Sequence, residues 1–232
     1  MISDKPDEFT WPTAPQPPIA VSDAIRRACT ADLVPRAPHN AFKRTLVSIV
    51  SSGAIFAIML TVGWMRHPPK AAMLYALLGA AAWGVTQGFV LYVSHGKPPG
   101  RRGSKSLRWA ALFVVPTAFL LHLAVTSGSV LSFHEFLVAP RSLHSTFVCG
   151  IHSLLFGALA SVVLFVLWRR TDPFCPKLTG ALTGLAGGMV GAIALDMTCA
   201  NDEGWHLWLG HGLTLVAFVF AGWFAGRRWL SP

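Results

Sequence analysis

The stretch from Leu178 to Glu203, LTGALTGLAGGMVGAIALDMTCANDE, decides the fold class of this sequence. Its apolar part is long enough to cross a bilayer, which takes about 20 residues. Glycines recur every four residues from Gly180 to Gly188, and this spacing lets a neighbouring helix approach closely in lipid. The stretch closes with an acid, Asp196, and a lone thiol, Cys199. It predicts a helix that packs inside a membrane bundle and carries a reactive group at one end, although glycine spacing alone favours a packing role.

The composition supports a membrane protein with several spans. Of the 232 residues, 53% are hydrophobic and only 12% are charged, and the mean hydropathy is +0.52. A soluble domain has about 25% charged residues. The net charge of +9 would suggest nucleic acid in a soluble protein, but in a membrane protein it more often records orientation. We therefore expect no direct contact with nucleic acid.

Six apolar spans are expected within a membrane domain of residues 45–228, at 45–65, 71–93, 109–131, 145–168, 178–198 and 206–226. The loops between them are short, so consecutive helices should be antiparallel neighbours. All of the 19 Lys and Arg except Arg66, Lys70 and Arg141 fall on one side of this arrangement. Positive residues gather on the cytoplasmic side. The expected fold is an all-α, six-transmembrane-helix bundle with both termini in the cytoplasm.

The N-terminal region carries different signals. Residues 1–20 are rich in proline and acid, which predicts a disordered, solvated arm, and they lack the apolar core of a cleavable signal peptide. Residues 21–44 predict a short cytoplasmic helix that ends before Pro35. Its candidate partner-binding residues form an apolar stripe with basic residues beside it: Val21, Ile25, Cys29 and Leu33, with Arg26, Arg27 and Arg36. Such a short helix is marginal alone, so it should fold against the bundle, the bilayer surface or a partner protein.

Two of the four cysteines fall on the expected outer face at similar depth. Cys149 lies near the outer end of the fourth span and Cys199 at the outer end of the fifth. They could form a disulfide, a soft-metal pair or a redox-sensing dithiol. The alternative is that both are small buried residues that never meet, because lone cysteines pack as small hydrophobes.

Further candidate metal ligands lie on the same side. His152 follows Cys149 by three residues and Asp196 precedes Cys199 by three, so each pair should share a helix face. The sixth span adds His206 and His211 near its outer end. These residues and the two thiols make a candidate site for a soft metal ion or an oxidant. No compact ligand motif such as CxxC supports it, and no other cofactor is expected.

Two other functions fit parts of the sequence. Ser153 on the fourth span and His211 on the sixth would suit an intramembrane serine protease, but the glycine-flanked serine motif of such enzymes is absent. A small six-span transporter is a better alternative, although no inverted repeat is apparent and Gln87 is the single mid-membrane amide. No catalytic residues are therefore expected, and the chain is not expected to be an enzyme.

Three stretches resemble one known family, the NrsF family of bacterial anti-sigma factors. The first is ADLVPRAP at 31–38, with Arg44 just before the membrane. The second is the fourth span, with Cys149 at one end and LWRR at 167–170 at the other. The third is the glycine-rich run that leads to Cys199, followed by a sixth span closed by GRRWL at 226–230. The likeness covers roughly residues 22–230 in order and topology.

The resemblance implies a multi-pass protein of the bacterial inner membrane that holds an extracytoplasmic-function sigma factor through its N-terminal segment. It further implies that Cys149 and Cys199 sense oxidants or heavy metals on the periplasmic side. The chain departs from the family pattern around its second cysteine, which reads DMTCA where the family usually has a histidine and Cys-Pro. Expected partners are therefore the sigma factor and membrane lipid. The alternative is a transporter, or a metal- or redox-responsive membrane protein without a sigma partner.

Overall fold

The computed structural model describes residues 23, 41–62, 70–97, 103–126, 143–172, 174–199, 201 and 203–231. The expected arm at 1–20 lies outside these residues. So do the candidate partner-binding residues Val21, Ile25, Arg26, Arg27, Cys29, Leu33 and Arg36.

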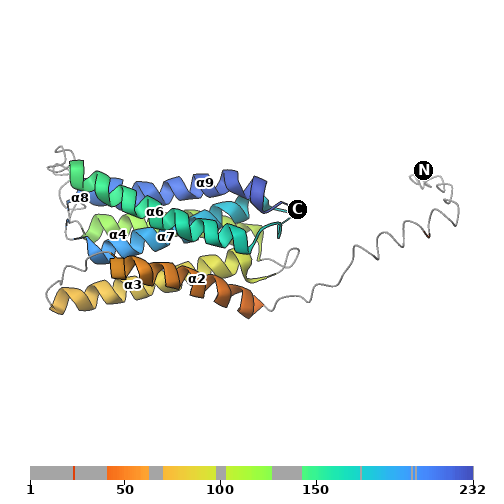
Figure 1. Ribbon diagram of the computed structural model, residues 1–232, viewed down its shortest axis with the longest axis horizontal. Helices are drawn as coiled ribbons and strands as arrows, with labels where there is room; N and C mark the ends of the chain where they lie inside the picture. The colour runs from red at the N-terminus through yellow and green to blue at the C-terminus, as the bar shows by residue number, and fades with distance from the viewer. Residues whose placement is uncertain are drawn as a thin grey trace, which may run out of the picture. The chain divides into compact units, whose positions relative to one another are not determined.

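The described part of the chain consists of helices and short connecting turns and has no strand. Its elements are α2 (Ala41–Val62), α3 (Lys70–Leu91), η1 (Tyr92–Gly96), α4 (Lys105–Thr126), α6 (Leu143–Leu167), α7 (Pro176–Thr198), α8 (Gly204–His206), η2 (Leu207–Gly212) and α9 (Leu213–Trp229). Counting α3 with η1, and α8 with η2 and α9, as single helices, they form six helices that are each long and apolar enough to cross a membrane. The helices run side by side (Figure 1). The expected all-α bundle of six such helices is confirmed.

Two helices begin earlier than the apolar runs alone suggest. α4 starts at Lys105 because Ser104 caps it, its hydroxyl accepting a hydrogen bond from the backbone N–H of Leu107 at 3.2 Å. α2 starts at Ala41, so that Arg44 lies inside this helix and not in the segment before it. The Arg44 side chain is only 6% exposed. Charged residues next to an apolar run are therefore part of these helices.

Helix α7 is the centre of the bundle. Every residue from Leu178 to Leu195 is buried, and α7 contacts each of the other five membrane-length helices. Glycine makes this possible. A Cβ at Gly184 would overlap the backbone carbonyl oxygen of Phe218 in α9, and one at Gly187 would overlap Ser161 in α6. The small-residue face that predicted close packing is thus in contact with two helices at once.

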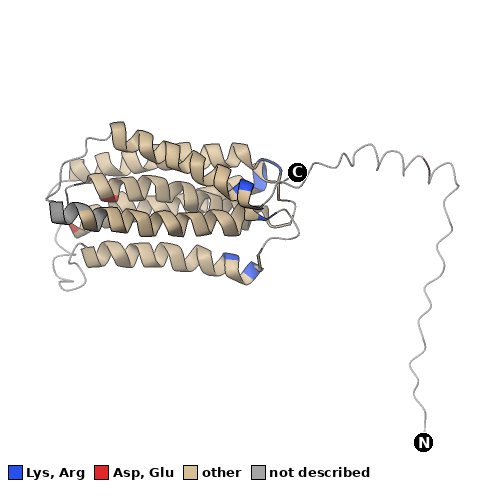
Figure 2. Cartoon of the chain, turned by 90° about the horizontal axis from the view of Figure 1, so that it is seen from below, with Lys and Arg blue, Asp and Glu red and all other residues tan. Residues whose placement is uncertain are grey.

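The basic residues of the described part of the chain gather at one end of the bundle (Figure 2). Apart from Lys70 at the start of α3, the described Lys and Arg residues lie at the end where α2 begins and α9 ends, which we call the basic end. Asp196 and Glu203 belong to the opposite end, where α7 ends and α8 begins. Two segments are π-helical: η1 continues α3 at the basic end, and η2 joins α8 to α9 at the opposite end. Single π turns inside helices are frequent at functional sites.

Candidate thiol–imidazole site

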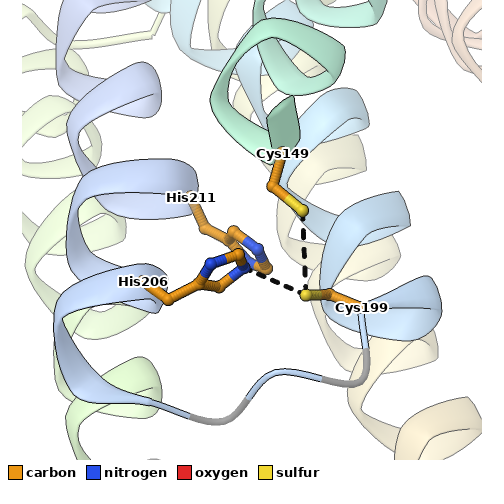
Figure 3. Close-up of side chains that lie close together, drawn as sticks. All are labelled: Cys149, Cys199, His206 and His211. Carbon is orange, nitrogen blue, oxygen red and sulfur yellow. Dashed lines mark hydrogen bonds between the residues drawn. The ribbon is translucent and has the colours of Figure 1, made fainter. Parts of the chain in front are cut away.

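Four candidate residues converge at the end of the bundle opposite the basic end (Figure 3). Cys149 comes from α6, Cys199 from the C-terminal cap of α7, His206 from α8 and His211 from η2. One sulfur or nitrogen atom from each residue lies within 4.8 Å of the corresponding atoms of the other three. We call these four residues the thiol–imidazole site.

The π-helical segment places the two imidazoles together. Residues five apart on an α-helix point about 140° away from each other, given 3.6 residues per turn. The wider turn of η2 brings His211 back beside His206, so that their ring centroids lie 5.5 Å apart. Both rings are 0% exposed. Sequence periodicity alone does not reveal this wider turn.

Direct contacts link three of the four residues. The Sγ atoms of Cys149 and Cys199 are 3.8 Å apart, which is a non-bonded contact between free thiols. The Cys199 sulfur lies 3.0 Å from Nε2 of His206. The other ring nitrogen of His206, Nδ1, lies 3.3 Å from the hydroxyl oxygen of Thr146. Thr146 therefore orients the imidazole toward the thiol, a role that the sequence analysis did not identify.

The fourth residue, His211, has polar atoms that no described residue satisfies. Both of its ring nitrogens are buried without a hydrogen-bond partner among the described residues. A buried polar group without a partner costs free energy, typically about 1–3 kcal/mol. Coordination of a metal ion through one nitrogen would remove part of this cost. Two thiolates and two imidazoles are also a common tetrahedral ligand set for Zn²⁺, and thiolates favour soft ions. The residues present therefore fit a metal ion of this class.

The structure does not bring the other two metal candidates into the thiol–imidazole site. The His152 side chain is exposed, and its Nδ1 lies 2.7 Å from the carbonyl oxygen of Val148 on its own helix. Asp196 instead meets α4, where its carboxylate lies 3.3 Å from Nε2 of His122. Spacing by three residues gave the correct helix but not the direction of either side chain. Asp196 and His122 therefore join α7 to α4 beside the site.

Two further residues weighed in the sequence have partners in the structure. The Ser153 hydroxyl lies 3.0 Å from the hydroxyl of Thr214 and makes no hydrogen bond with His211, so it lacks the hydrogen-bonded base that a nucleophilic serine needs. The side-chain amide of Gln87 donates a hydrogen bond to the carbonyl oxygen of Ala186 at 2.8 Å. This mid-membrane amide therefore joins α3 to α7.

The surroundings of Cys199 favour its thiolate form. A hydrogen bond from Cys149 is the largest cause, the neighbouring rings of His206 and His211 act in the same direction, and together they outweigh burial. The pKa of Cys199 is consequently lowered from its ordinary value. Because the thiolate is both the nucleophile and the metal ligand, Cys199 is the reactive member of the pair.

We expect Cys199 in the folded protein to react with iodoacetamide below the pH range in which an ordinary thiol reacts. Its pKa is depressed, so lowering the pH leaves thiolate in the folded chain after the same cysteine in the denatured chain has become protonated. Mass spectrometry of the Cys199 peptide, from native and denatured protein labelled across a pH series, measures the difference. Identical pH profiles in the two states would contradict the expectation.

A second buried polar cluster lies at the basic end of α7. Thr179 donates its hydroxyl to Asp172 and accepts from Arg108, and the Arg108 guanidinium lies 3.5 Å from the Asp172 carboxylate. One turn further, Nε2 of His95 in η1 lies 2.8 Å from the hydroxyl of Thr183. Helix α7 therefore carries a thiol at one end and a hydroxyl-centred network at the other.

This second cluster reaches the start of the first membrane-length helix. Arg44 in α2 donates from Nε to the carbonyl oxygen of His95 at 2.8 Å. Its guanidinium carbon lies 4.3 Å from the ring centroid of Trp168. Trp168 in turn donates to the hydroxyl of Ser48. His95 therefore connects α7 to α2, because its ring contacts Thr183 and its carbonyl oxygen accepts a hydrogen bond from Arg44.

Fold and site together define a class: a bundle with six membrane-length helices among the described residues, and with paired thiols and imidazoles at one end. Residues 30–231 match the family of negative regulators of sigma F, NrsF. The chain belongs to this family, as the resemblance in its sequence implied. No curated protein and no solved structure matches the chain.

Proposed function

We propose that this protein is a bacterial inner-membrane anti-sigma factor with a thiol sensor. Its segment at 21–44 holds an extracytoplasmic-function sigma factor at the cytoplasmic face. A heavy-metal ion or an oxidant at Cys149 and Cys199 triggers release. The carrying observation is the match to a family of negative regulators of a sigma factor over residues 30–231.

The charge distribution supports the orientation in this proposal. Positive residues gather on the cytoplasmic side of membrane proteins, and the basic end is where α2 begins and α9 ends. Both termini then face the cytoplasm, and the thiol–imidazole site faces the periplasm. A periplasmic signal would therefore act at the end of the bundle opposite the sigma-binding segment.

Two chemical events fit the site. In the first, both thiols lose their protons and one electron each, a sulfur–sulfur bond forms, and an external oxidant takes up the two electrons. The sulfurs must approach by well over 1 Å, from 3.8 Å to the roughly 2.05 Å of a disulfide. In the second, Cys149 and Cys199 hold a soft metal ion as thiolates, with His206 and His211 as further ligands. Disulfide formation pulls α6 and α7 together, whereas a bound metal ion ties both helices to the histidines of α8 and η2.

Helix α7 supports a route from the site to the binding segment. It is buried from Leu178 to Leu195. At the basic end of α7, the hydroxyl of Thr179 bonds to Arg108 and that of Thr183 to His95. Signalling requires two packings of similar free energy that the signal can bias. In this proposal a shift of α7 exchanges the partners of Thr179 and Thr183, and Arg44 passes the change to α2.

Co-purification of the full chain with the extracytoplasmic-function sigma factors of its own genome tests the proposal. We expect one of them to bind the full chain, and a variant that lacks residues 1–38 to bind it at least about a hundredfold more weakly, because every proposed partner-binding residue from Val21 to Arg36 is gone. The variant retains every described helix of the bundle, which begins at Ala41. Binding of no sigma factor, or equal binding by the shortened chain, would reject the anti-sigma function.

A further inference from the structure

A groove of about 520 Å³ runs between α4 and α9, on membrane-length helices. Its lining is apolar and largely aromatic, with Thr117 as its one hydroxyl-bearing residue. Phe113 on α4 and both Phe220 and Phe224 on α9 are more than half exposed and form its walls. This volume lies in the range of small-molecule binding sites. In a bilayer, the groove would face acyl chains.

One end of the groove is closed by aromatic rings and a cation. The ring centroids of Trp109 and Trp223 lie 5.7 Å apart across the groove. Nζ of Lys177, at the start of α7, lies 5.9 Å from the centroid of the Trp223 ring. This is within the range of a cation–π contact, about 6 Å. The groove therefore has an apolar body and a cationic end.

Two more cations continue the helix faces that line the groove. Lys105 precedes Trp109 by four residues, and Arg227 follows Trp223 by four, so each lies on the same helix face one turn toward the basic end. Both side chains are exposed, as is Lys177. Among the described residues, no carboxylate oxygen lies within 4.0 Å of these three cations. We call Lys105, Lys177 and Arg227 the groove rim.

Helix stability does not account for this charge. α4 and α7 both begin at the basic end, and each has a lysine and no acid in its first turn. Helix N-termini favour anions and disfavour cations. The positive-inside rule explains the sign of these residues, but not their position on the faces that line one groove. Two helix N-termini and three cations together make a site for an anion.

We propose that this groove binds an anionic phospholipid of the cytoplasmic leaflet. One acyl chain lies between α4 and α9, and the headgroup phosphate lies among Lys105, Lys177 and Arg227. Basic pockets between transmembrane helices on the cytoplasmic side bind such headgroups in other proteins. The continuous apolar groove beneath the rim selects a phospholipid over free phosphate. The proposal is independent of the thiol–imidazole site and of any sigma factor.

Native mass spectrometry of the full chain in detergent, titrated with phosphatidylglycerol and with phosphatidylcholine of identical acyl chains, tests this lipid site. We expect the first phosphatidylglycerol to bind at least about tenfold more tightly than phosphatidylcholine, since each basic residue near a membrane surface raises the affinity for anionic lipid severalfold. The triple variant Lys105→Gln, Lys177→Gln, Arg227→Gln should lose this preference. A preference retained by the triple variant, or absent from the natural chain, would overturn the proposal.

A matched control separates the site from general attraction. Lys43, Lys97 and Arg169 are exposed residues of the basic end, and none of them lies on α4 or α9, the two helices that line the groove. Their triple replacement by glutamine changes the net charge equally and should keep the preference. Thr117→Trp should weaken binding of both lipids, because the indole fills the groove and leaves the rim intact. Equal loss in the two triple variants, or no effect of Thr117→Trp, would show nonspecific attraction only. Single Lys105→Gln and Arg227→Gln variants should show smaller losses of the same kind.

Discussion

Gly184→Ala is expected to destabilise the bundle by about 3 kcal/mol, a large fraction of the stability of a typical domain. The single added carbon would overlap the carbonyl oxygen of Phe218 and crowd the Cα of Gly222 in α9. Neither is the end of a flexible side chain, so the clash can be relieved only if α7 and α9 move apart. Because α7 contacts every other membrane-length helix, this separation disturbs the whole bundle. Reversible unfolding in mixed detergent micelles, followed by circular dichroism, measures the change.

Gly84→Ala provides a matched control. It adds the same atom to a helical glycine of α3, where no atom lies within 4 Å of the added carbon. Glycine inside a helix costs roughly 0.5–1 kcal/mol relative to alanine, so this variant should be neutral or slightly more stable. If the two variants had equal stability, the close contact between α7 and α9 could not be what holds the bundle together.

The sequence predicted the large-scale order of this fold because that order depends on local properties. In a bilayer, the backbone N–H and C=O groups of a run of about 20 apolar residues must hydrogen-bond to one another. Only a helix achieves this within a single segment. The glycine face of Leu178–Glu203 likewise marked the most crowded helix, since small residues serve where backbones meet. Two of the three stretches that resemble the NrsF family lie along these same helices. Span count, the central helix and the family all followed from such features.

The members of the candidate site were harder to predict because they depend on the angular position of each side chain. His152 and Cys149 are three residues apart on one helix, yet only Cys149 turns toward α7. His211 reaches the site because η2 widens the helix by one residue at that turn. Asp196 contacts His122, which is 74 residues away in sequence, and not the thiol–imidazole site. Each of these outcomes needs the positions of other helices.

Cys199→Ser is expected to abolish the response of the protein to soft metal ions and oxidants. Serine keeps the size of the side chain but supplies no thiolate, which is the group that soft ions bind and oxidants attack. We expect the affinity for Cd²⁺ to fall at least about a hundredfold, and the bound sigma factor to remain bound after treatment with Cd²⁺ or diamide. Thiolate–cadmium absorption of the purified chain and co-purification of the sigma factor measure the two effects.

Cys175 and the outward-facing His152 supply controls for this variant. Cys175 is at the N-terminal cap of α7, the end opposite Cys199, and His152 faces away from the site, so Cys175→Ser and His152→Ala should behave as the natural chain. His211→Gln distinguishes the two chemical events. A disulfide between Cys149 and Cys199 does not require this imidazole, so disulfide formation and release by diamide should persist while the affinity for Cd²⁺ falls. If His211→Gln left the Cd²⁺ affinity unchanged, the imidazole would not be a ligand. If Cys199→Ser still released the sigma factor normally, the sensor would lie elsewhere in the protein.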